Sequence, residues 1–138
     1  MATLEALREG LAAKLVTVPG LTQVSAYRLG NPMPPCAMVT GPARIQYDGA
    51  HQRGHDVWEL IVMAFVAVTD DGSSQRLFDE FVAADGERSF KQALEAGDLT
   101  LGGVCSDLRV TEFTGYGLYD VPGAGSLLGG ESTVQIIG

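Results

Sequence analysis

Two histidines four residues apart, His51 and His55, have the spacing in this chain that comes closest to a metal site. Asp48 and Asp56 lie beside them, so imidazole and carboxylate groups are close together in the sequence. A structural zinc site needs several convergent ligands that a helix or a rigid turn aims at the ion. These histidines belong to a polar, glycine-containing loop, and the chain has no third histidine. We therefore interpret the segment as a solvated or interface loop and expect no metal.

A second arrangement places two carboxylates, Asp70 and Asp71, beside two hydroxyls, Ser73 and Ser74. A nucleophilic serine needs an adjacent base, and the chain has no G-x-S-x-G motif to present one on a sharp turn. An Asp-Asp-Gly turn followed by a helix cap explains every residue of the segment. We expect Ser73 or Ser74 to cap that helix.

Glycines near the C-terminus, Gly123 with Gly125 and Gly129 with Gly130, resemble a phosphate-binding loop in composition. Such a loop needs a Lys-Ser or Lys-Thr pair and a helix that opens directly after it, and neither follows here. We interpret these glycines as flexible connections or as positions where another backbone approaches closely.

The two cysteines, Cys36 and Cys105, are far apart in the sequence and have neither C-x-x-C nor metal-ligand spacing. Cys36 follows a Pro-Pro pair without a neighbouring base, which favours a free, partly buried thiol over a nucleophile. The N-terminus has no signal-peptide pattern, so we expect a soluble protein made in a reducing compartment, without disulfides. Together these patterns predict a protein that is not an enzyme and needs no cofactor.

One apolar segment, Val57–Val68, dominates the elements that must hold these residues. Its β-branched and aromatic residues favour a strand over a helix. Trp58 and Val62 share one face while Ile61 and Phe65 share the other, so both faces are apolar. Such a strand is typically central in a sheet and covered on both sides. Its most apolar run, Leu60–Val68, is much shorter than the ~20 apolar residues that span a bilayer as a helix, and we expect no membrane association.

The helical patterns predict three helices. Thr3 caps a first helix, which carries leucines at helical spacing and ends at Pro19-Gly20. A capping box from Ser89 to Gln92 opens a short third helix that ends at Gly97. The second helix follows the Asp-Asp-Gly turn, and its predicted buried stripe consists of Leu77, Phe78, Phe81 and Val82.

The remaining strands are expected at residues 22–29, 37–40, 44–47, 104–113 and 133–137, with a looser stretch at 114–130. Runs of strands with helices set apart are typical of an α+β fold. The 138 residues, 46% of them hydrophobic, suit one compact domain. We therefore predict a single domain over residues 1–138. Its mostly antiparallel β-sheet carries an N-terminal helix and a two-helix insertion packed on it.

The formal net charge of −8 argues against a protein that grips nucleic acid. An acidic surface repels phosphate, whereas a protein that grips nucleic acid needs lysine and arginine. The same charge is compatible with a channel wall past which DNA slides. One candidate acidic region, either facing a lumen or forming an ordinary solvated outer face, consists of Asp70, Asp71, Glu80, Asp85 and Glu87.

The order of several short motifs carries a family resemblance. A first helix closes on Val18-Pro19-Gly20-Leu21 and is followed by a proline-rich loop at 31–35. Tyr47-Asp48-Gly49 precedes the long strand, which an Asp-Asp-Gly-Ser turn and a helix follow. Ser89 with Ala93-Leu94, then Gly102-Gly103-Val104 and a glycine-rich stretch, lead to the final strand. This order resembles the small tail-terminator and tail-completion proteins of long-tailed bacteriophages, particularly those of actinobacterial hosts.

The resemblance implies a ring, usually of six copies, that caps the tail tube, ends its polymerisation and provides the joint to the head–tail connector. It implies assembly in the host cytoplasm and a place in the virion, at the tail–neck junction. The implied partners are further copies of the chain, the tail-tube protein and a connector or stopper protein, while genomic DNA passes through without specific binding.

Candidate contact residues follow from exposed tyrosines, the 48–56 loop and the last strand. For Tyr116 and Tyr119, the alternative to an interface contact is a local packing role. The candidates are Tyr47, Asp48, His51, Arg53, His55, Tyr116, Tyr119, Ile136 and Ile137. Two other classes stay open. One is a different neck component, such as a head-completion or stopper protein, and the other is a small-molecule-binding domain, which would need convergent polar groups.

Overall fold

A five-stranded mixed sheet forms the centre of the protein. The computed structural model describes residues 3–47, 56–69, 71–122 and 125–138. The strands are β1 (Gln23–Ser25), β2 (Cys36–Gln46), β3 (Val57–Ala67), β4 (Asp107–Val121) and β5 (Gly125–Ile137). Their order across the sheet is β1-β2-β3-β5-β4. Only β1 and β2 are parallel and the other pairs are antiparallel, so the predicted α+β fold with a mostly antiparallel sheet is confirmed.

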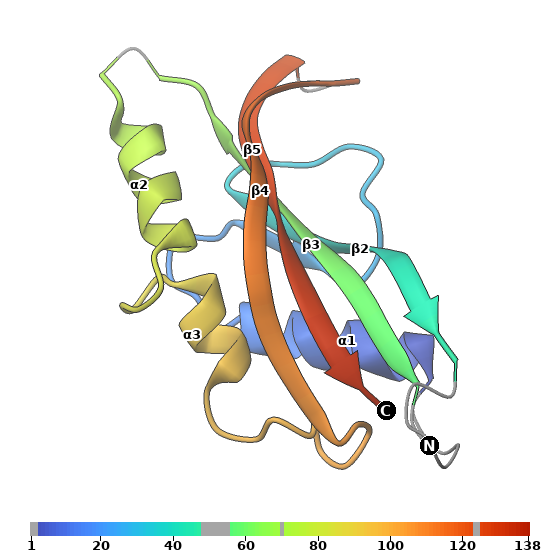
Figure 1. The fold of residues 1–138 in the computed structure, drawn as a ribbon. Coiled ribbons are helices and arrows are strands. Elements are labelled where there is room, and N and C mark those ends of the chain that lie inside the picture. Colours follow the sequence, from blue (N-terminus) through green and yellow to red (C-terminus); the bar gives the residue numbers. More distant parts are fainter. Residues whose placement is uncertain (1–2, 48–55, 70, 123–124) are drawn as a thin grey trace.

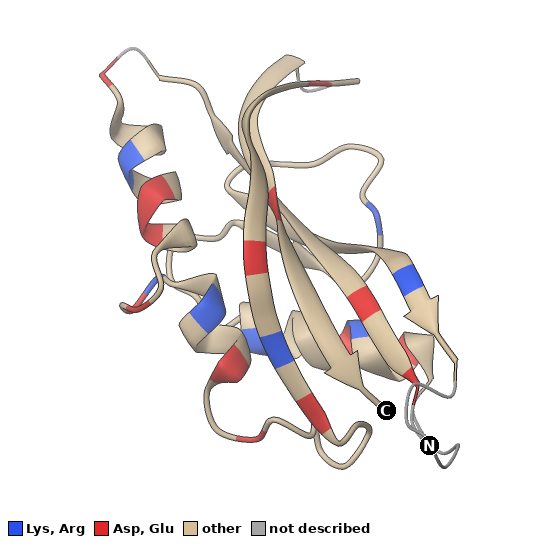
Figure 2. Cartoon of the chain, in the orientation of Figure 1, with Lys and Arg blue, Asp and Glu red and all other residues tan. Residues whose placement is uncertain are grey.

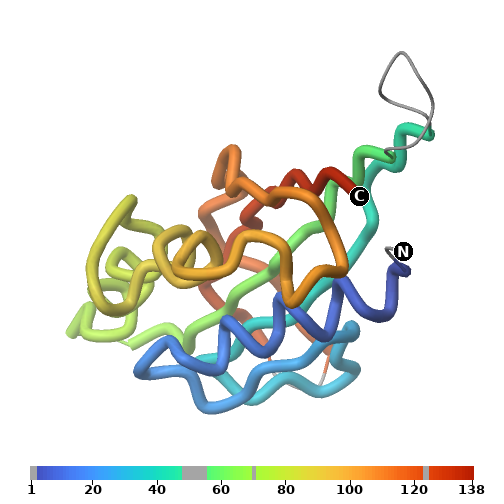
Figure 3. The backbone as a smooth tube through the Cα atoms, turned by 90° about the horizontal axis from the view of Figure 1, so that it is seen from below, coloured from blue at the N-terminus to red at the C-terminus, as the bar shows by residue number. Residues whose placement is uncertain are grey.

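Three helices pack against this sheet. They are α1 (Leu4–Leu15), α2 (Ser73–Val82) and α3 (Phe90–Glu95). In Figure 1, α1 lies behind the sheet, while α2 and α3 lie beside β4. Figure 3, which looks from below, again places α1 on one side of the strands. The N-terminal helix and the two-helix insertion between β3 and β4 are therefore present as predicted.

Two helix caps predicted from the local sequence are present in the structure. Thr3 Oγ1 accepts the Ala6 N–H at 3.2 Å, and Ser89 Oγ accepts the Gln92 N–H at 3.1 Å. Both caps were predicted, and they satisfy N–H groups that have no partner within the helix.

The predicted serine cap of α2 is wrong. Gly72, with φ at 75°, occupies the cap position and has no side chain to accept a bond. The free N–H groups are satisfied from residues further upstream. Asp71 Oδ1 accepts the Ser73 N–H at 3.0 Å, and Thr69 Oγ1 accepts the Ser74 N–H at 3.3 Å. The turn, rather than the serines, therefore starts this helix.

The strand β3 is central, between β2 and β5, as its composition predicted. Leu60, Val62 and Val66 are completely buried and face the helices. They pack with leucines of α1 and with Phe78, Phe81 and Phe90 of the insertion. The other side of β3 is only partly covered, since Ile61 and Met63 remain half-buried. Cover on both sides is therefore incomplete.

The long C-terminal hairpin was not predicted. The pattern indicated strands at 104–113 and 133–137 with looser chain between them, but β4 and β5 pair from Asp107 with Ile137 up to Val121 with Gly125. The predicted strands at 37–40 and 44–47 likewise form a single strand, β2, whose register shifts between Thr40 and Arg44. The strand predicted at 22–29 contracts to β1.

Two glycines explain how the hairpin fits. A Cβ on Gly129 would lie 2.7 Å from the Ala64 carbonyl oxygen, and a Cβ on Gly130 would meet the Phe113 ring. Strand β5 passes close to both neighbours at this point, so only residues without side chains fit. The alternative that these glycines mark a close backbone approach is therefore the right one.

Candidate interaction surface

The sheet has one face that no helix of the described residues covers, and we call it the open face. Side chains alternate along a strand, so this face follows from the register. Its rows join Arg44 with Glu59 and Glu59 with Gln135, and Gln135 with Arg109. Figure 2 marks charged positions along β2, β3 and β4.

The half of the open face near the C-terminus is charged. Arg44 and Glu59 form an ion pair at 3.7 Å, with 60% and 30% of their side chains exposed. Three further carboxylates share this face, at Asp107, Glu112 and Glu131. Alternation along the predicted strand at 104–113 was a signal for Asp107, but Glu112 follows a register shift in β4 and Glu131 lies outside the predicted strands.

The other half of the open face is an apolar groove, which we call the tip groove, with a volume of about 350 Å³. It lies between the loop before β2 and the end of the β4–β5 hairpin. Phe65 and Tyr119 meet edge to face on its floor, with ring centroids 5.7 Å apart. The residues that line it are Arg28, Leu29, Gly30, Pro32, Met38, Met63, Phe65, Tyr119, Asp120, Val121 and Pro122.

The helix side of the same hairpin end carries an exposed apolar patch. We define this hairpin patch as Val68, Leu118 and Leu128, which line one shallow depression with Thr69 and Gln75. Val68 is 58% exposed and Leu118 is 68% exposed, although both are strongly apolar. Exposed apolar side chains that lie together are typical of contact sites.

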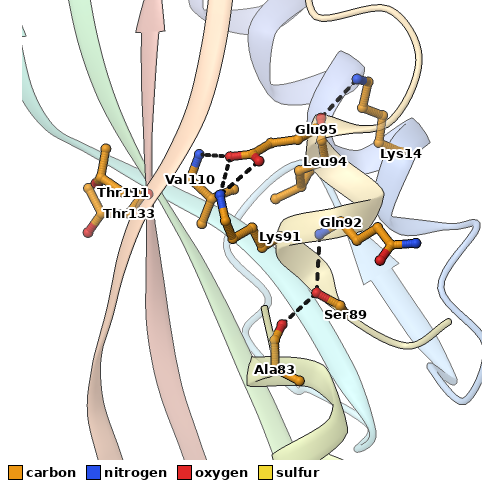
Figure 4. Close-up of polar contacts among 10 residues, drawn as sticks. All are labelled: Lys14, Ala83, Ser89, Lys91, Gln92, Leu94, Glu95, Val110, Thr111 and Thr133. Atoms are coloured by element: carbon orange, nitrogen blue, oxygen red, sulfur yellow. Dashed lines mark hydrogen bonds and ion pairs between the residues drawn. The ribbon is translucent and has the colours of Figure 1, made fainter. Parts of the chain in front are cut away.

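Charged side chains bind backbone groups of the outer strand β4, and of β2 beyond the short segment that β1 covers, and so limit edge pairing. The Arg8 guanidinium donates to the carbonyl oxygens of Val39, at 2.8 Å, and of Gly41 on β2. On β4, Glu95 Oε2 accepts the Val110 N–H at 2.9 Å and also holds Lys91 Nζ (Figure 4). Unpaired edge groups are templates for strand addition. At these positions the chain satisfies them itself.

The Glu95 carboxylate accepts hydrogen bonds from two groups, the Lys91 ammonium and the Val110 N–H. Burial alone would raise its pKa, but hydrogen bonds from Lys91 and the Val110 N–H, with the Lys91 and Arg109 charges, hold the pKa below its ordinary value.

Lys14 anchors the following loop to α1, because its ammonium donates to the carbonyls of Leu94, Ala96 and Asp98 at 2.7 to 3.0 Å. Burial lowers the pKa of Lys14.

The predicted contact tyrosines are separated by the structure. Tyr47 is 71% exposed at the end of β2. Tyr116 is 41% exposed, and its hydroxyl donates to Asp79 Oδ1 at 2.6 Å, while burial and that carboxylate raise its pKa. Tyr119 lines the tip groove, and its hydroxyl donates to the Gly115 carbonyl at 2.6 Å. Local packing and exposure therefore coexist at Tyr116 and Tyr119.

The last strand does not offer a free edge. Strand β5 lies between β3 and β4, so its backbone is paired on both sides. Ile136 is completely buried in the core, which removes it from the candidate contacts, and Ile137 is half-buried. The local pattern could not reveal this, because strand order depends on pairing between distant segments.

The described residues of the predicted acidic region lie in the turn before α2, on α2 and in the segment after it. Asp71, Asp85 and Glu87 are exposed, and Glu80 pairs with Arg88 at 2.6 Å. They lie on other elements than the carboxylates of the open face. The remaining candidates, Asp48, His51, Arg53, His55 and Asp70, are outside the described residues.

Groups that could do chemistry do not converge in the part of the chain that the structure describes. No group of three or more His, Cys, Asp or Glu side chains is placed to hold a metal ion there. Cys36 and Cys105 are free and buried. Burial raises the pKa of the Cys36 thiol to about 11. No helix within the described ranges combines the length and apolar character that crossing a bilayer requires.

No protein-family model matches the chain, and the curated proteins include no sequence match to it.

Proposed function

We propose that this chain is a structural subunit of a phage tail, of the tail-terminator class, which forms a ring on the end of the tail tube. The observation that carries the proposal is the pairing of an apolar groove with an exposed apolar patch at one end of the sheet. A ring subunit needs self-complementary surfaces of this kind and no reaction centre. The order of sequence motifs supports the tail-terminator class in particular.

The charge distribution supports a role beside DNA. A formal net charge of −8 per copy, repeated around a ring, lets a polyanion pass without being held. The carboxylates on the open face are Glu59, Asp107, Glu112 and Glu131, and Arg44 and Arg109 offset them only in part. An acidic open face suits a lumen better than a basic one would, since lysine and arginine would bind the phosphates.

The decisive experiment is deletion of the gene from its phage, followed by electron microscopy of the tails. Loss of a terminator should give overlong tubes of variable length, and a plasmid copy of the wild-type gene should restore the uniform length. Tails of normal length with heads that leak DNA would instead identify a stopper or another neck protein. Normal virions would refute both assignments.

A measurement on the purified chain complements the genetic test. Light scattering after size exclusion, with and without purified tail-tube protein, should reveal a ring and its binding to tube ends. A chain that stays monomeric and does not bind the tube would count against the terminator assignment.

The tip groove, at about 350 Å³, also suits an apolar small molecule. Clear thermal stabilisation by one compound in a ligand screen would favour that second candidate.

A further inference from the structure

We infer that neighbouring copies join through the hairpin end, with the hairpin patch of one copy seated in the tip groove of the next. This deepens the proposed function, on which it rests for the closure of the ring, by assigning the surfaces that two subunits share. The occupant of the groove is thus a second copy of this chain.

The first support is chemical fit. The patch presents two aliphatic side chains, Val68 and Leu118, that are more than half exposed in the isolated chain. The groove offers aromatic rings and two methionines, Met38 and Met63, whose unbranched side chains adapt to an incoming group. Its volume of about 350 Å³ accommodates several aliphatic groups.

The second support is the position of the two surfaces on opposite faces of one sheet end. Leu118 and Tyr119 are adjacent in β4, so their side chains point to opposite sides. Leu118 belongs to the patch and Tyr119 to the groove. A two-fold dimer cannot fill both grooves at once with this geometry. A head-to-tail contact fills every groove and leaves each patch for the next copy, which closes into a ring when the rotation allows.

The third support is charge complementarity at the rims. Arg28 is an exposed cation on the groove. Asp71, exposed in the turn before α2, lies two residues after Thr69 of the patch depression. Seating the patch in the groove brings a carboxylate of one copy toward a guanidinium of its neighbour. Such rim pairs contribute mainly to specificity and orientation.

The test measures self-association of the purified full chain by analytical ultracentrifugation. Leu118→Ser should weaken association at least ~10-fold, because it removes most of the apolar surface of an exposed anchor. Val16→Ser is the matched control, since Val16 is 67% exposed and Leu118 is 68% exposed. Val16 lies at the end of α1, so its substitution should leave association unchanged.

Charge reversal gives an independent arm. Arg28→Asp should weaken association, and adding Asp71→Lys should restore it in the double variant. Asp71→Asn removes the charge but keeps an oxygen that can accept the Ser73 N–H, so a loss in this variant reflects the rim contact rather than the helix start. Circular dichroism should show that all variants are folded.

The outcomes separate this inference from the proposed function. A chain that is monomeric at every concentration, or a ring that L118S and R28D leave intact, overturns the inference. In the second case the terminator assignment still stands on the deletion phenotype. If instead the variants abolish assembly and the deletion leaves tail length normal, the contact holds and the proposed function fails.

Discussion

Replacing Glu95 with alanine should destabilise the protein, because this carboxylate supplies the acceptor for a backbone N–H on the outer strand β4. Glu95 Oε2 accepts the Val110 N–H at 2.9 Å, and Lys91 Nζ lies 2.8 Å from both carboxylate oxygens. Val110 is only 9% exposed, so water would replace the lost acceptor poorly. The N–H would remain without a good partner in the alanine variant.

The expected loss of unfolding free energy has two parts, one from the hydrogen bond to the Val110 N–H and one from the ion pair with Lys91. Leaving a buried donor unsatisfied costs about 1–3 kcal/mol. The ion pair adds little, since Lys91 is 41% exposed and helical pairs of this spacing contribute about 0.3–0.5 kcal/mol. We expect Glu95→Ala to cost about 1.5–3 kcal/mol of unfolding free energy. Glu95→Gln keeps an acceptor oxygen and should cost less than about 1 kcal/mol, similar to Lys91→Met.

The pH dependence of the unfolding free energy is an independent check that the ionised Glu95 carboxylate stabilises the fold. The pKa of Glu95 lies below its ordinary value of 4.5 in the folded chain. A carboxyl group of this kind stabilises the fold at pH above 4.5 and loses that contribution as the pH falls through the folded pKa. The difference in unfolding free energy between wild type and E95Q should therefore shrink as the pH falls below 4.5.

Urea unfolding of wild type, E95A, E95Q and K91M, followed by circular dichroism at neutral and acidic pH, measures all of these differences. Two results would refute the reasoning. If E95A equals K91M, the Val110 N–H does not depend on the carboxylate. If E95Q is as damaging as E95A, the charge rather than the acceptor oxygen is what stabilises the strand.

Two further predictions concern the core. Gly129→Ala should destabilise the fold by about 1–3 kcal/mol or more, because its Cβ would press on the Ala64 carbonyl, which cannot move without shifting β3. Thermal unfolding should show a lower Tm, and a Tm equal to wild type would mean that β5 lies further from β3 than described. Cys36 should resist iodoacetamide at pH 8 in the native protein, because burial excludes the reagent and raises the thiol pKa to about 11. Mass spectrometry should find it modified only after denaturation, and rapid labelling of the folded chain would contradict its burial.

Local patterns in the sequence were enough for much of the helical layer and for the central strand. The leucine spacing after Thr3 determines α1, because one face of a helix collects residues at that interval. Ser89 marks the start of α3 in the same local way. The composition of Val57–Val68 predicted a central strand covered on both faces. Strand β3 is central, but Ile61 and Met63 stay half-buried on the face that the helices do not cover.

The candidate contacts were harder to predict, because exposure depends on which strands pair. Ile136 looked like the end of a free strand, but β5 is paired on both sides and this side chain is completely buried. Leu118 lay within a stretch expected to be loose, and it is an exposed member of the hairpin patch. Neither outcome follows from residues nearby in the chain.

The 114–130 stretch shows where local sequence patterns are not sufficient and pairing between distant strands decides the structure. Its glycines and tyrosines indicate a flexible connection when only neighbours in sequence are considered. In the folded chain, the rings of Phe65 and Phe113 and the backbone of β3 lie where side chains on Gly129 and Gly130 would be. Composition alone indicated a folded chain with an apolar core and an acidic net charge. Tertiary pairing decided the long hairpin and, with it, the groove and the patch, because these surfaces exist only where distant strands meet.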